Sequence, residues 1–217
     1  MFDWRYAWDT LPALGAALVV TLQATAGGMA IALVLGLALA LARRSQRAWI
    51  AWPAGATIEF VRSTPLLVQI YFLFYVLPEA GLRASPLVTG VLALGVHYAA
   101  YCAEVYRAGL ESVPRGQWEA AAALNLGRFR TLAAVIVPQA IPPVVPALGN
   151  YLVAMFKDTP LLSAITVVEL LQTAKLVGAE RFRYVEPLTL VGILFLVLSL
   201  VSAAGIGWVE RRLQSRH

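Results

Sequence analysis

The chain has 217 residues, of which 60% are hydrophobic and only 13% are charged. Soluble domains have about 45–50% apolar and about 25% charged residues, so this composition excludes an ordinary soluble domain and predicts several membrane-spanning helices. The formal net charge is +5, but the basic residues lie beside apolar segments, which indicates an oriented membrane protein and argues against a nucleic-acid-binding surface. We therefore expect an all-α integral membrane protein with five transmembrane helices.

The first predicted span, at about residues 11–42, is nearly uncharged and about ten residues longer than the roughly 20 that cross a bilayer. We expect this helix to be tilted or to extend beyond the membrane. It ends at the basic residues Arg43, Arg44 and Arg47, which are typical of a cytoplasmic loop.

The second predicted span, at about residues 49–77, is interrupted by Glu59, Arg62 and the sequence Ser63-Thr64-Pro65. Glu59 and Arg62 are three residues apart and share one helical face, so they are expected to pair with each other or with a partner inside the bundle. Proline is expected to loosen the helix here. The sequence leaves open whether the break is a packed kink or a gate.

The third predicted span, at about residues 87–106, carries His97, Tyr98, Tyr101 and Glu104. His97, Tyr101 and Glu104 recur at intervals of four and three residues and therefore share one stripe of the helix. Such a stripe suits the polar lining of a transport pathway. Alternatively, His97 is a hydrogen-bonded core residue, and the sequence leaves both interpretations open.

A polar loop at residues 107–137 separates the third and fourth predicted spans. Within it, residues 117–124 are expected to form a short helix, because Glu119 lies in the first turn, where the helix dipole favours an anion, and four alanines follow. An alanine face lets another surface approach the backbone closely, which favours docking on a partner. Asn125 is expected to end the helix in the left-handed conformation, and Gly127 adds a second flexible point.

The fourth predicted span, at about residues 138–156, is rich in proline and stops at Lys157, Asp158 and Thr159. The apolar run that follows is too short to cross a bilayer. Charged, non-helical backbone at this depth is tolerated only where protein or water covers it. We therefore expect the segment 157–171 to be a broken helix that lines a cavity.

The last part of the chain is expected to form an exposed outer loop at residues 173–186 and a fifth span at about residues 187–208. The presumed inner segments carry an excess of arginine over acidic residues, whereas the presumed outer segments do not. This bias predicts that the N-terminus lies outside and the C-terminus in the cytoplasm.

Several motifs resemble those of a known family. Glu119-Ala120-Ala121, a turn residue four positions further on, and Ile136-Val137-Pro138 resemble the EAA loop of the membrane subunits of ABC importers. That family has glycine at the turn where this chain has Asn125, and both residues tolerate a positive φ. Further blocks resemble the polar amino-acid branch of the family, at residues 62–69, 103–109, 138–140, 148–150 and 157–161. The whole sequence looks closest to the permeases of ectoine and hydroxyectoine uptake systems.

The resemblance implies a single transmembrane permease domain over residues 1–217, with the type I ABC importer permease fold, in the bacterial cytoplasmic (inner) membrane. It implies translocation of ectoine or hydroxyectoine, with polar amino acids such as glutamine, arginine or histidine as the alternative. The implied partners are a separate ATPase subunit that docks on residues 117–127, a second permease chain, identical or related, and an extracytoplasmic solute-binding protein. ATP and Mg²⁺ are expected on the ATPase subunit, and no cofactor or metal on this chain.

Two groups of residues are expected to carry the function that the resemblance implies. The residues expected to couple the chain to the ATPase subunit are Gln117, Glu119, Ala120, Ala121, Asn125, Gly127 and Pro138. The residues expected to line the substrate pathway are Glu59, Arg62, His97, Tyr98, Tyr101, Glu104, Lys157, Asp158 and Thr159.

Motifs of covalent catalysis are missing from the sequence. It contains no Gly-x-x-x-x-Gly-Lys-Ser/Thr, no His-Glu-x-x-His and no Gly-x-Ser-x-Gly, so we expect a transport subunit without its own ATPase site rather than an enzyme. A secondary transporter is disfavoured, because five spans do not divide into equal repeats. A purely structural membrane anchor would leave the charges of Glu59, Arg62, Glu104 and Lys157 at costly depths without a role.

Overall fold

The computed structural model describes residues 2–214, which are helical and contain no strand. In chain order the α-helices are α1 (Trp4–Arg43), α2 (Ala48–Ser63), α3 (Leu66–Tyr71), α4 (Pro86–Glu111), α5 (Arg115–Ala123), α6 (Arg128–Thr131), α7 (Val137–Asp158), α8 (Leu170–Glu180) and α9 (Val185–Gln214). Short π- and 3₁₀-helical segments adjoin them: η1 (Phe72–Val76), η2 (Leu77–Ala80), η3 (Leu132–Ile136) and η4 (Thr159–Ile165).

Four helical stretches in the described residues are long and apolar enough to cross a membrane: α1, α4, the stretch Arg128–Ile165 that joins α6 to η4, and α9. The pair formed by α2 and the segment Leu66–Ala80 makes a fifth if it is counted as one span. The all-α expectation is therefore confirmed for this part of the chain, with four or five spans. The in–out orientation stays a prediction.

The second predicted span is fully broken. α2 ends at Ser63, Thr64 is extended with φ −109° and ψ 139°, and the helical axis bends by 106°. Pro65 causes this break, because it lacks an N–H group and disfavours the helical conformation of the residue before it. The side-chain amide of Gln69 donates to the Val61 carbonyl at 2.8 Å and so satisfies a carbonyl that α2 leaves open at its end.

The polar loop predicted at residues 107–137 is helical at both of its ends. α4 continues to Glu111, and helical structure resumes at Arg128. The reason is packing that the local sequence does not reveal: Ile136 is fully buried and packs in one cluster with Val113 and Ala140. Burial of this face stabilises the helix through the end of the predicted loop.

Residues 173–186, predicted as an exposed outer loop, instead lie partly in helix α8. Glu169 caps this helix, because its carboxylate accepts hydrogen bonds from the backbone N–H groups of Leu171, at 2.9 Å, and Gln172, at 2.8 Å. Burial of Glu169 raises the pKa of its carboxyl group. Leu170 is also fully buried and packs with α1, which explains why the segment folds onto the bundle.

The helix is interrupted within residues 157–171, where a broken helix that lines a cavity was predicted; the cavity stays a prediction. α7 ends at Asp158, η4 follows, and Thr166 takes a left-handed φ of 67° before the chain reaches α8. Leu162 and Ile165 are fully buried, so protein covers this irregular backbone, as its depth in an apolar bundle requires.

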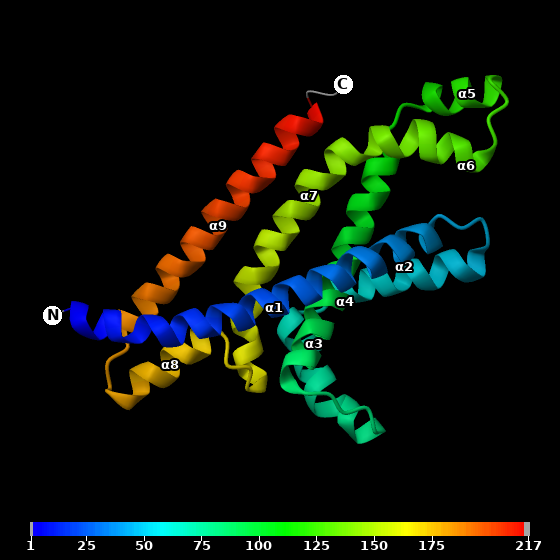
Figure 1. Ribbon diagram of the computed structural model, residues 1–217. Helices are drawn as coiled ribbons and strands as arrows, with labels where there is room; N and C mark the ends of the chain where they lie inside the picture. Colours follow the sequence, from blue (N-terminus) through cyan, green and yellow to red (C-terminus); the bar gives the residue numbers. More distant parts are fainter. Residues whose placement is uncertain (1, 215–217) are drawn as a thin grey trace.

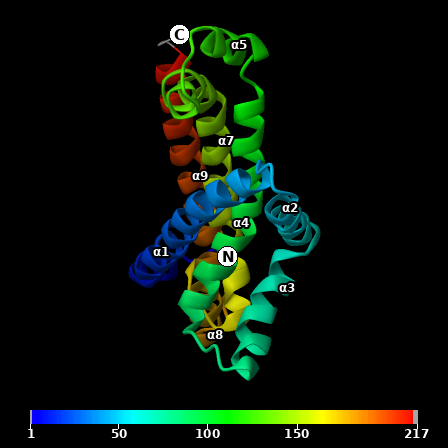
Figure 2. The same cartoon turned by 90° about the vertical axis from the view of Figure 1, so that its right-hand side faces the viewer.

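Helix α1 crosses the other long helices at a steep angle (Figures 1 and 2). Its contact with α4 depends on small residues. A Cβ atom at Gly36 would lie 2.7 Å from the Cβ of Cys102 and 2.8 Å from the Ala99 carbonyl oxygen. A Cβ atom at Gly95 would lie 2.7 Å from the Cβ of Ile31. Glycine at these positions lets the two backbones approach more closely than larger residues allow.

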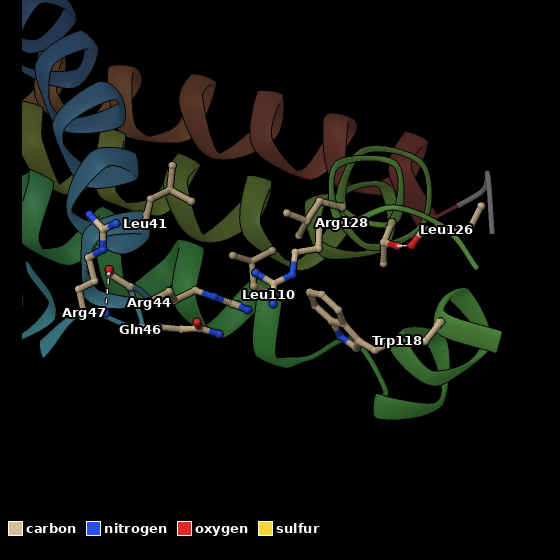
Figure 3. A pocket seen from close by; sticks show the side chains of 12 residues that line it. Leu41, Arg44, Gln46, Arg47, Leu110, Trp118, Leu126 and Arg128 are labelled. Carbon is tan, nitrogen blue, oxygen red and sulfur yellow. Dashed lines mark hydrogen bonds between the residues drawn. The ribbon is translucent and has the colours of Figure 1, made fainter. Parts of the chain in front are cut away.

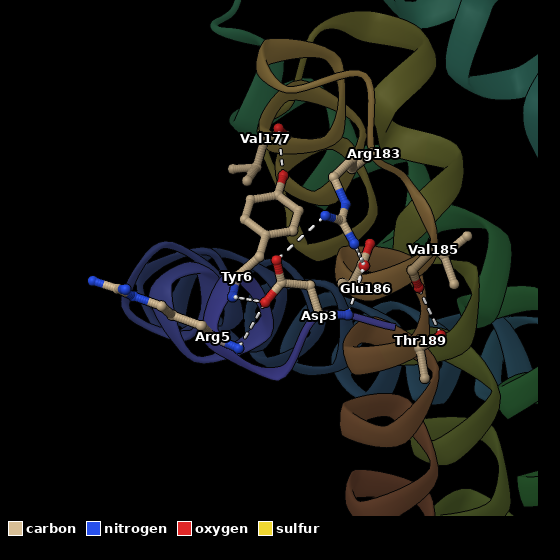
Figure 4. A network of polar contacts seen from close by, with 8 residues as sticks. All are labelled: Asp3, Arg5, Tyr6, Val177, Arg183, Val185, Glu186 and Thr189. Atoms are coloured by element: carbon tan, nitrogen blue, oxygen red, sulfur yellow. Dashed lines mark hydrogen bonds and ion pairs between the residues drawn. The ribbon is translucent and has the colours of Figure 1, made fainter. Parts of the chain in front are cut away.

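The start of α1 is tied to the turn between α8 and α9 (Figure 4). The backbone N–H of Asp3 donates to Glu186 at 3.0 Å, and Arg183 forms ion pairs with both Asp3 and Glu186. The hydroxyl of Tyr6 donates to the Val177 carbonyl at 2.9 Å. The hydrogen bond with Glu186 raises the pKa of the Arg183 guanidinium. The hydrogen bonds of Asp3 and Tyr6 join residues 183 and 171 positions apart, so they fix the end of α1 that α4 does not reach.

We predict that Gly36→Ala destabilises the fold, because overpacking a close helix crossing costs about 1–3 kcal/mol. Gly15→Ala is the matched control on the same helix, since nothing lies within 4 Å of its Cβ position. Its expected effect is neutral or stabilising, by up to about 1 kcal/mol of helix propensity. The measurement is the thermal unfolding midpoint of the purified protein. The midpoint is the temperature at which half of the monodisperse protein is lost. Equal midpoints for the two variants would contradict the crossing described here.

Candidate functional site

Aromatic side chains from α4 and α7 form a connected group, here called the aromatic cluster: His97, Tyr98, Tyr101 and Tyr151. The ring centroids of His97 and Tyr101 lie 5.2 Å apart, and those of Tyr101 and Tyr151 lie 5.5 Å apart. Tyr98 lies 5.5 Å from His97 and 6.1 Å from Tyr151. These separations are typical of aromatic rings in contact, so the cluster is one continuous aromatic surface.

Polar and charged groups border this cluster. The Tyr98 hydroxyl donates to the Asp158 carboxylate at 2.7 Å, and His97 Nδ1 lies 3.1 Å from Gln69 Oε1. The Arg62 guanidinium lies 5.6 Å from the centroid of the Tyr101 ring. The cluster therefore carries a carboxylate and a cation on neighbouring tyrosines, whose centroids are 6.1 Å apart.

The structure thus brings together Arg62, His97, Tyr98, Tyr101 and Asp158 from the residues expected to line the pathway. Gln69 and Tyr151 were not expected in this group. A signal for Tyr151 was present in the sequence, because it lies seven residues before Asp158 and so shares its helical face. Gln69 likewise lies seven residues after Arg62, but the break at Thr64 interrupts the helix between them, so this spacing did not indicate that Gln69 contacts His97.

Glu104 is engaged by two arginines, and its expected place on the substrate pathway stays a prediction. It forms ion pairs with Arg43 of α1, at 2.6 Å, and with Arg107, at 2.8 Å. Its side chain is 20% exposed. Glu104 follows Tyr101 by three residues, but its negative charge joins α1 to α4, because Arg43 lies opposite it at the end of α1.

The other expected pathway residues lie outside the cluster. Glu59 and Arg62 were expected to pair with each other or with another partner; Glu59 is exposed, whereas Arg62 lies against the Tyr101 ring, which fits the second alternative. Lys157 is exposed. Thr159 is fully buried, and its hydroxyl donates to the Phe156 carbonyl at 2.7 Å. Among the described residues, no group of three or more His, Cys, Asp or Glu side chains is placed to hold a metal ion.

Helix α5 projects from one end of the bundle, beyond the end of α4 (Figure 2). It runs from Arg115 to Ala123, two residues earlier at its start than predicted. Asn125 has a φ of 53°, which confirms the expected left-handed turn. The side-chain amide of Gln139 in α7 donates to Gln117 at 3.3 Å and to the Val135 carbonyl at 2.7 Å, so the helix is tied back to the bundle.

The residues expected to couple to a partner are mostly accessible. Ala121 is 2% exposed and faces the bundle. The exposed members are Gln117, Glu119, Ala120, Asn125, Gly127 and Pro138. The outer face of α5 therefore carries one acidic and several small side chains, which another surface can approach closely.

Comparison with known proteins places this fold in a family. The family model described as "Binding-protein-dependent transport system inner membrane component" matches residues 32–215. The chain therefore belongs to that family. It has the type I ABC importer permease fold and is an integral inner membrane protein.

Individual relatives cover nearly the whole chain. A probable amino-acid ABC transporter permease of Sinorhizobium fredii is 47% identical and covers 97% of this chain and 96% of its own length. The glutamine transport system permease of Escherichia coli is 35% identical, with 98% of each chain covered. The octopine transport system permease of Rhizobium meliloti is 38% identical, over 97% of this chain and 92% of the relative.

Among solved structures, an amino acid ABC transporter crystallised with histidines has a TM-score of 0.93 and 32% identity, over 98% of this chain and 99% of that one. The inward-facing methionine transporter has a TM-score of 0.75 at 20% identity and supports the fold alone. The bundle as a whole therefore has a close experimental counterpart.

We predict that Asn125→Val loosens the end of α5, because a left-handed conformation costs a residue with a Cβ about 1–2 kcal/mol and a β-branched residue is least able to adopt it. Asn125→Gly is the matched control and is expected to keep the turn. The measurement is hydrogen exchange of the backbone amides at residues 115–127. Unchanged protection in the valine variant would contradict the role assigned to this turn.

Proposed function

We propose that this chain is the permease subunit of an ABC importer for polar amino acids, and that the aromatic cluster with Arg62 and Asp158 lies on the substrate pathway. The observation that carries the proposal is the pairing of a cation and a carboxylate on neighbouring tyrosine rings. An amino acid has a carboxylate and an ammonium group. Arg62 suits the first group, and Asp158 with the tyrosine faces suits the second.

The relatives support amino acids better than ectoine. Those reported above are named for amino acids, glutamine and octopine, and the similar crystal structure was determined with histidines. Ectoine also joins a carboxylate to a cation, so the charges of the cluster alone do not distinguish the two classes. The alternative expectation from the sequence is therefore the better supported one.

In this proposal the chain works with the partners of an ABC importer. A second permease chain completes the pathway, a solute-binding protein delivers the substrate, and an ATPase subunit docks on the exposed face of α5. Because α5 is tied to α7 through Gln117 and Gln139, displacement of the docked subunit moves the helix that carries Tyr151 and Asp158. Asn125→Val is then expected to lower uptake while ATP hydrolysis continues.

The substrate class is tested by reconstituting the chain with its ATPase subunit and binding protein in liposomes. ATP-dependent uptake of labelled glutamine is expected, with competition by unlabelled arginine or histidine. Uptake of labelled ectoine is expected to stay at background. Uptake of ectoine, inhibited by hydroxyectoine but not by amino acids, would return the assignment to ectoine.

We predict that Asp158→Asn lowers uptake by roughly 10- to 100-fold, since a hydrogen bond to a charged group contributes about 1.5–3 kcal/mol. Asp9→Asn removes the same charge at an exposed position and is expected to leave uptake unchanged. Co-purification of the ATPase subunit with both variants separates lost transport from lost assembly. Full uptake by Asp158→Asn, with normal assembly, would remove this residue from the pathway.

The orientation is tested by cysteine labelling in a Cys102→Ala background. Leu82→Cys and Glu180→Cys are expected to react with an impermeant reagent in intact cells, because both positions are exposed at the predicted outer side. Gln46→Cys and Gln117→Cys, exposed at the predicted inner side, are expected to react only after the membrane is opened. Labelling of Gln117→Cys in intact cells would overturn both the orientation and the docking of an ATPase on α5.

A further inference from the structure

Two adjoining hollows lie beside the ends of α1 and α4. The first, here called the arginine cavity, has a volume of about 670 Å³ and is bordered by Arg44, Arg47, Arg128 and Trp118 (Figure 3). The second, here called the apolar groove, has a volume of about 250 Å³ and runs along α1, α4 and α7. They share the side chains of Leu41, Leu110 and Leu132. The two hollows are therefore one continuous surface with a charged end and an apolar end.

The charged end is entirely basic. No aspartate or glutamate lines the arginine cavity, and none of its three arginines forms an ion pair with a carboxylate among the residues that the structure describes. Arg44 lies 5.9 Å from the ring centroid of Trp118. By contrast, Arg43 of α1 and Arg107 of α4 both contact Glu104.

Three cations around one cavity repel each other unless an anion lies between them. Guanidinium groups bind phosphate oxygens with two parallel hydrogen bonds, which makes phosphate a favoured ligand for such a set. Ser45, Gln46 and Thr131 also line the cavity and add uncharged hydrogen-bonding groups. This end therefore has the chemistry of a phosphate headgroup site.

The apolar end offers no polar group of its own to a ligand. Its lining is aliphatic apart from Tyr106, whose hydroxyl donates to the Leu33 carbonyl at 3.3 Å. Leu37, Leu41 and Ile141 are 44%, 58% and 40% exposed. Within a bilayer such a groove is filled by hydrocarbon rather than by water.

This surface is separate from the proposed substrate pathway. Tyr106 and Leu110 follow Tyr101 by five and nine residues, which places them about 140° and 180° around α4 at roughly 100° per residue. The groove therefore lies on the face of α4 turned away from the aromatic cluster. A ligand here contacts α1, α4 and the base of α5 rather than the transported molecule.

We propose that this surface binds an anionic phospholipid of the inner leaflet, with its phosphate among Arg44, Arg47 and Arg128 and one acyl chain in the apolar groove. Placing the site in the inner leaflet rests on the proposed orientation of the chain, whereas binding itself does not. The lipid links the end of α1 to α4 and, through Trp118, to α5. Such a link makes the position of α5 depend on the charge of the surrounding membrane.

Lipid binding is tested on the full-length permease, delipidated in detergent and titrated with phosphatidylglycerol or phosphatidylcholine of the same acyl chains. Native mass spectrometry counts the bound lipids. Phosphatidylglycerol is expected to bind at least about tenfold more tightly, since each arginine near an anionic lipid contributes about a fivefold gain in affinity. Equal binding of the two lipids would overturn the proposal.

The site is tested with matched variants. Arg44→Gln, Arg47→Gln and Arg128→Gln together are expected to reduce phosphatidylglycerol binding to the level of phosphatidylcholine. The control set removes the same total charge at exposed positions elsewhere: Arg83→Gln, Arg115→Gln and Arg130→Gln. An equal loss in the control set would show that net charge, rather than this cavity, attracts the lipid.

The groove has its own matched pair on α1, because Leu37 and Leu22 are both 44% exposed. Leu37→Gln is expected to weaken phosphatidylglycerol binding severalfold, whereas Leu22→Gln, outside the groove, is expected to leave it unchanged.

Millimolar inorganic phosphate is expected not to displace the lipid, and displacement would make this a site for a free anion. If the arginine variant keeps the lipid but no longer binds the ATPase subunit, the cavity receives a side chain of that subunit and the lipid assignment is wrong.

Discussion

The close crossing of α1 over α4 is the constraint on which the rest of the structure depends. Gly36 and Gly95 allow the two backbones to meet without intervening side chains, and this contact holds α4 in place. α4 in turn supplies three of the four rings of the aromatic cluster. The ends of α1 are fixed separately, by Asp3 with Arg183 at one side and by Arg43 with Glu104 at the other. The steeply tilted helix α1 thus holds in place α4, the helix that carries most of the site.

The apolar bundle tolerates its buried polar side chains because, among the described residues, each has a partner. In the part of the chain that the structure describes, no buried side-chain nitrogen or oxygen lacks a hydrogen bond. Gln69 serves twice, since its amide nitrogen satisfies the end of α2 while its oxygen faces His97. The break at Pro65 therefore stabilises one side of the aromatic cluster instead of only interrupting a span. An unsatisfied carbonyl in its place would cost about 1–3 kcal/mol.

Helix α7 links the proposed docking helix α5 to the aromatic cluster. Trp118 of α5 borders the arginine cavity, and Gln117 of the same helix contacts Gln139 of α7. α7 carries Tyr151 and Asp158 at its far end. In the proposed cycle, a displacement of α5 passes along α7 to the aromatic cluster, while Trp118 of α5 borders the proposed lipid site.

Local patterns in the sequence determined the helical class, the break at Pro65, the left-handed turn at Asn125 and the placing of His97 and Tyr101 on one stripe of α4. Each of these depends on residues within about one helical turn of each other, where hydropathy, proline and helical spacing act directly. Most residues of the candidate site were also expected from the sequence, namely Arg62, His97, Tyr98, Tyr101 and Asp158.

Only the tertiary structure decided the partners of the charged groups and the ends of the helices. Glu104 shares the helical stripe of Tyr101, but it forms an ion pair with Arg43, which lies 61 positions earlier in the chain. Gln69 joins the site because of a bend of 106°, and Arg128–Ile136 is helical because Ile136 is buried under Val113. The arginine cavity likewise exists only where the ends of α1 and α4 meet α5. These features depend on which helix packs beside which, and such contacts leave no periodic signal in the local sequence.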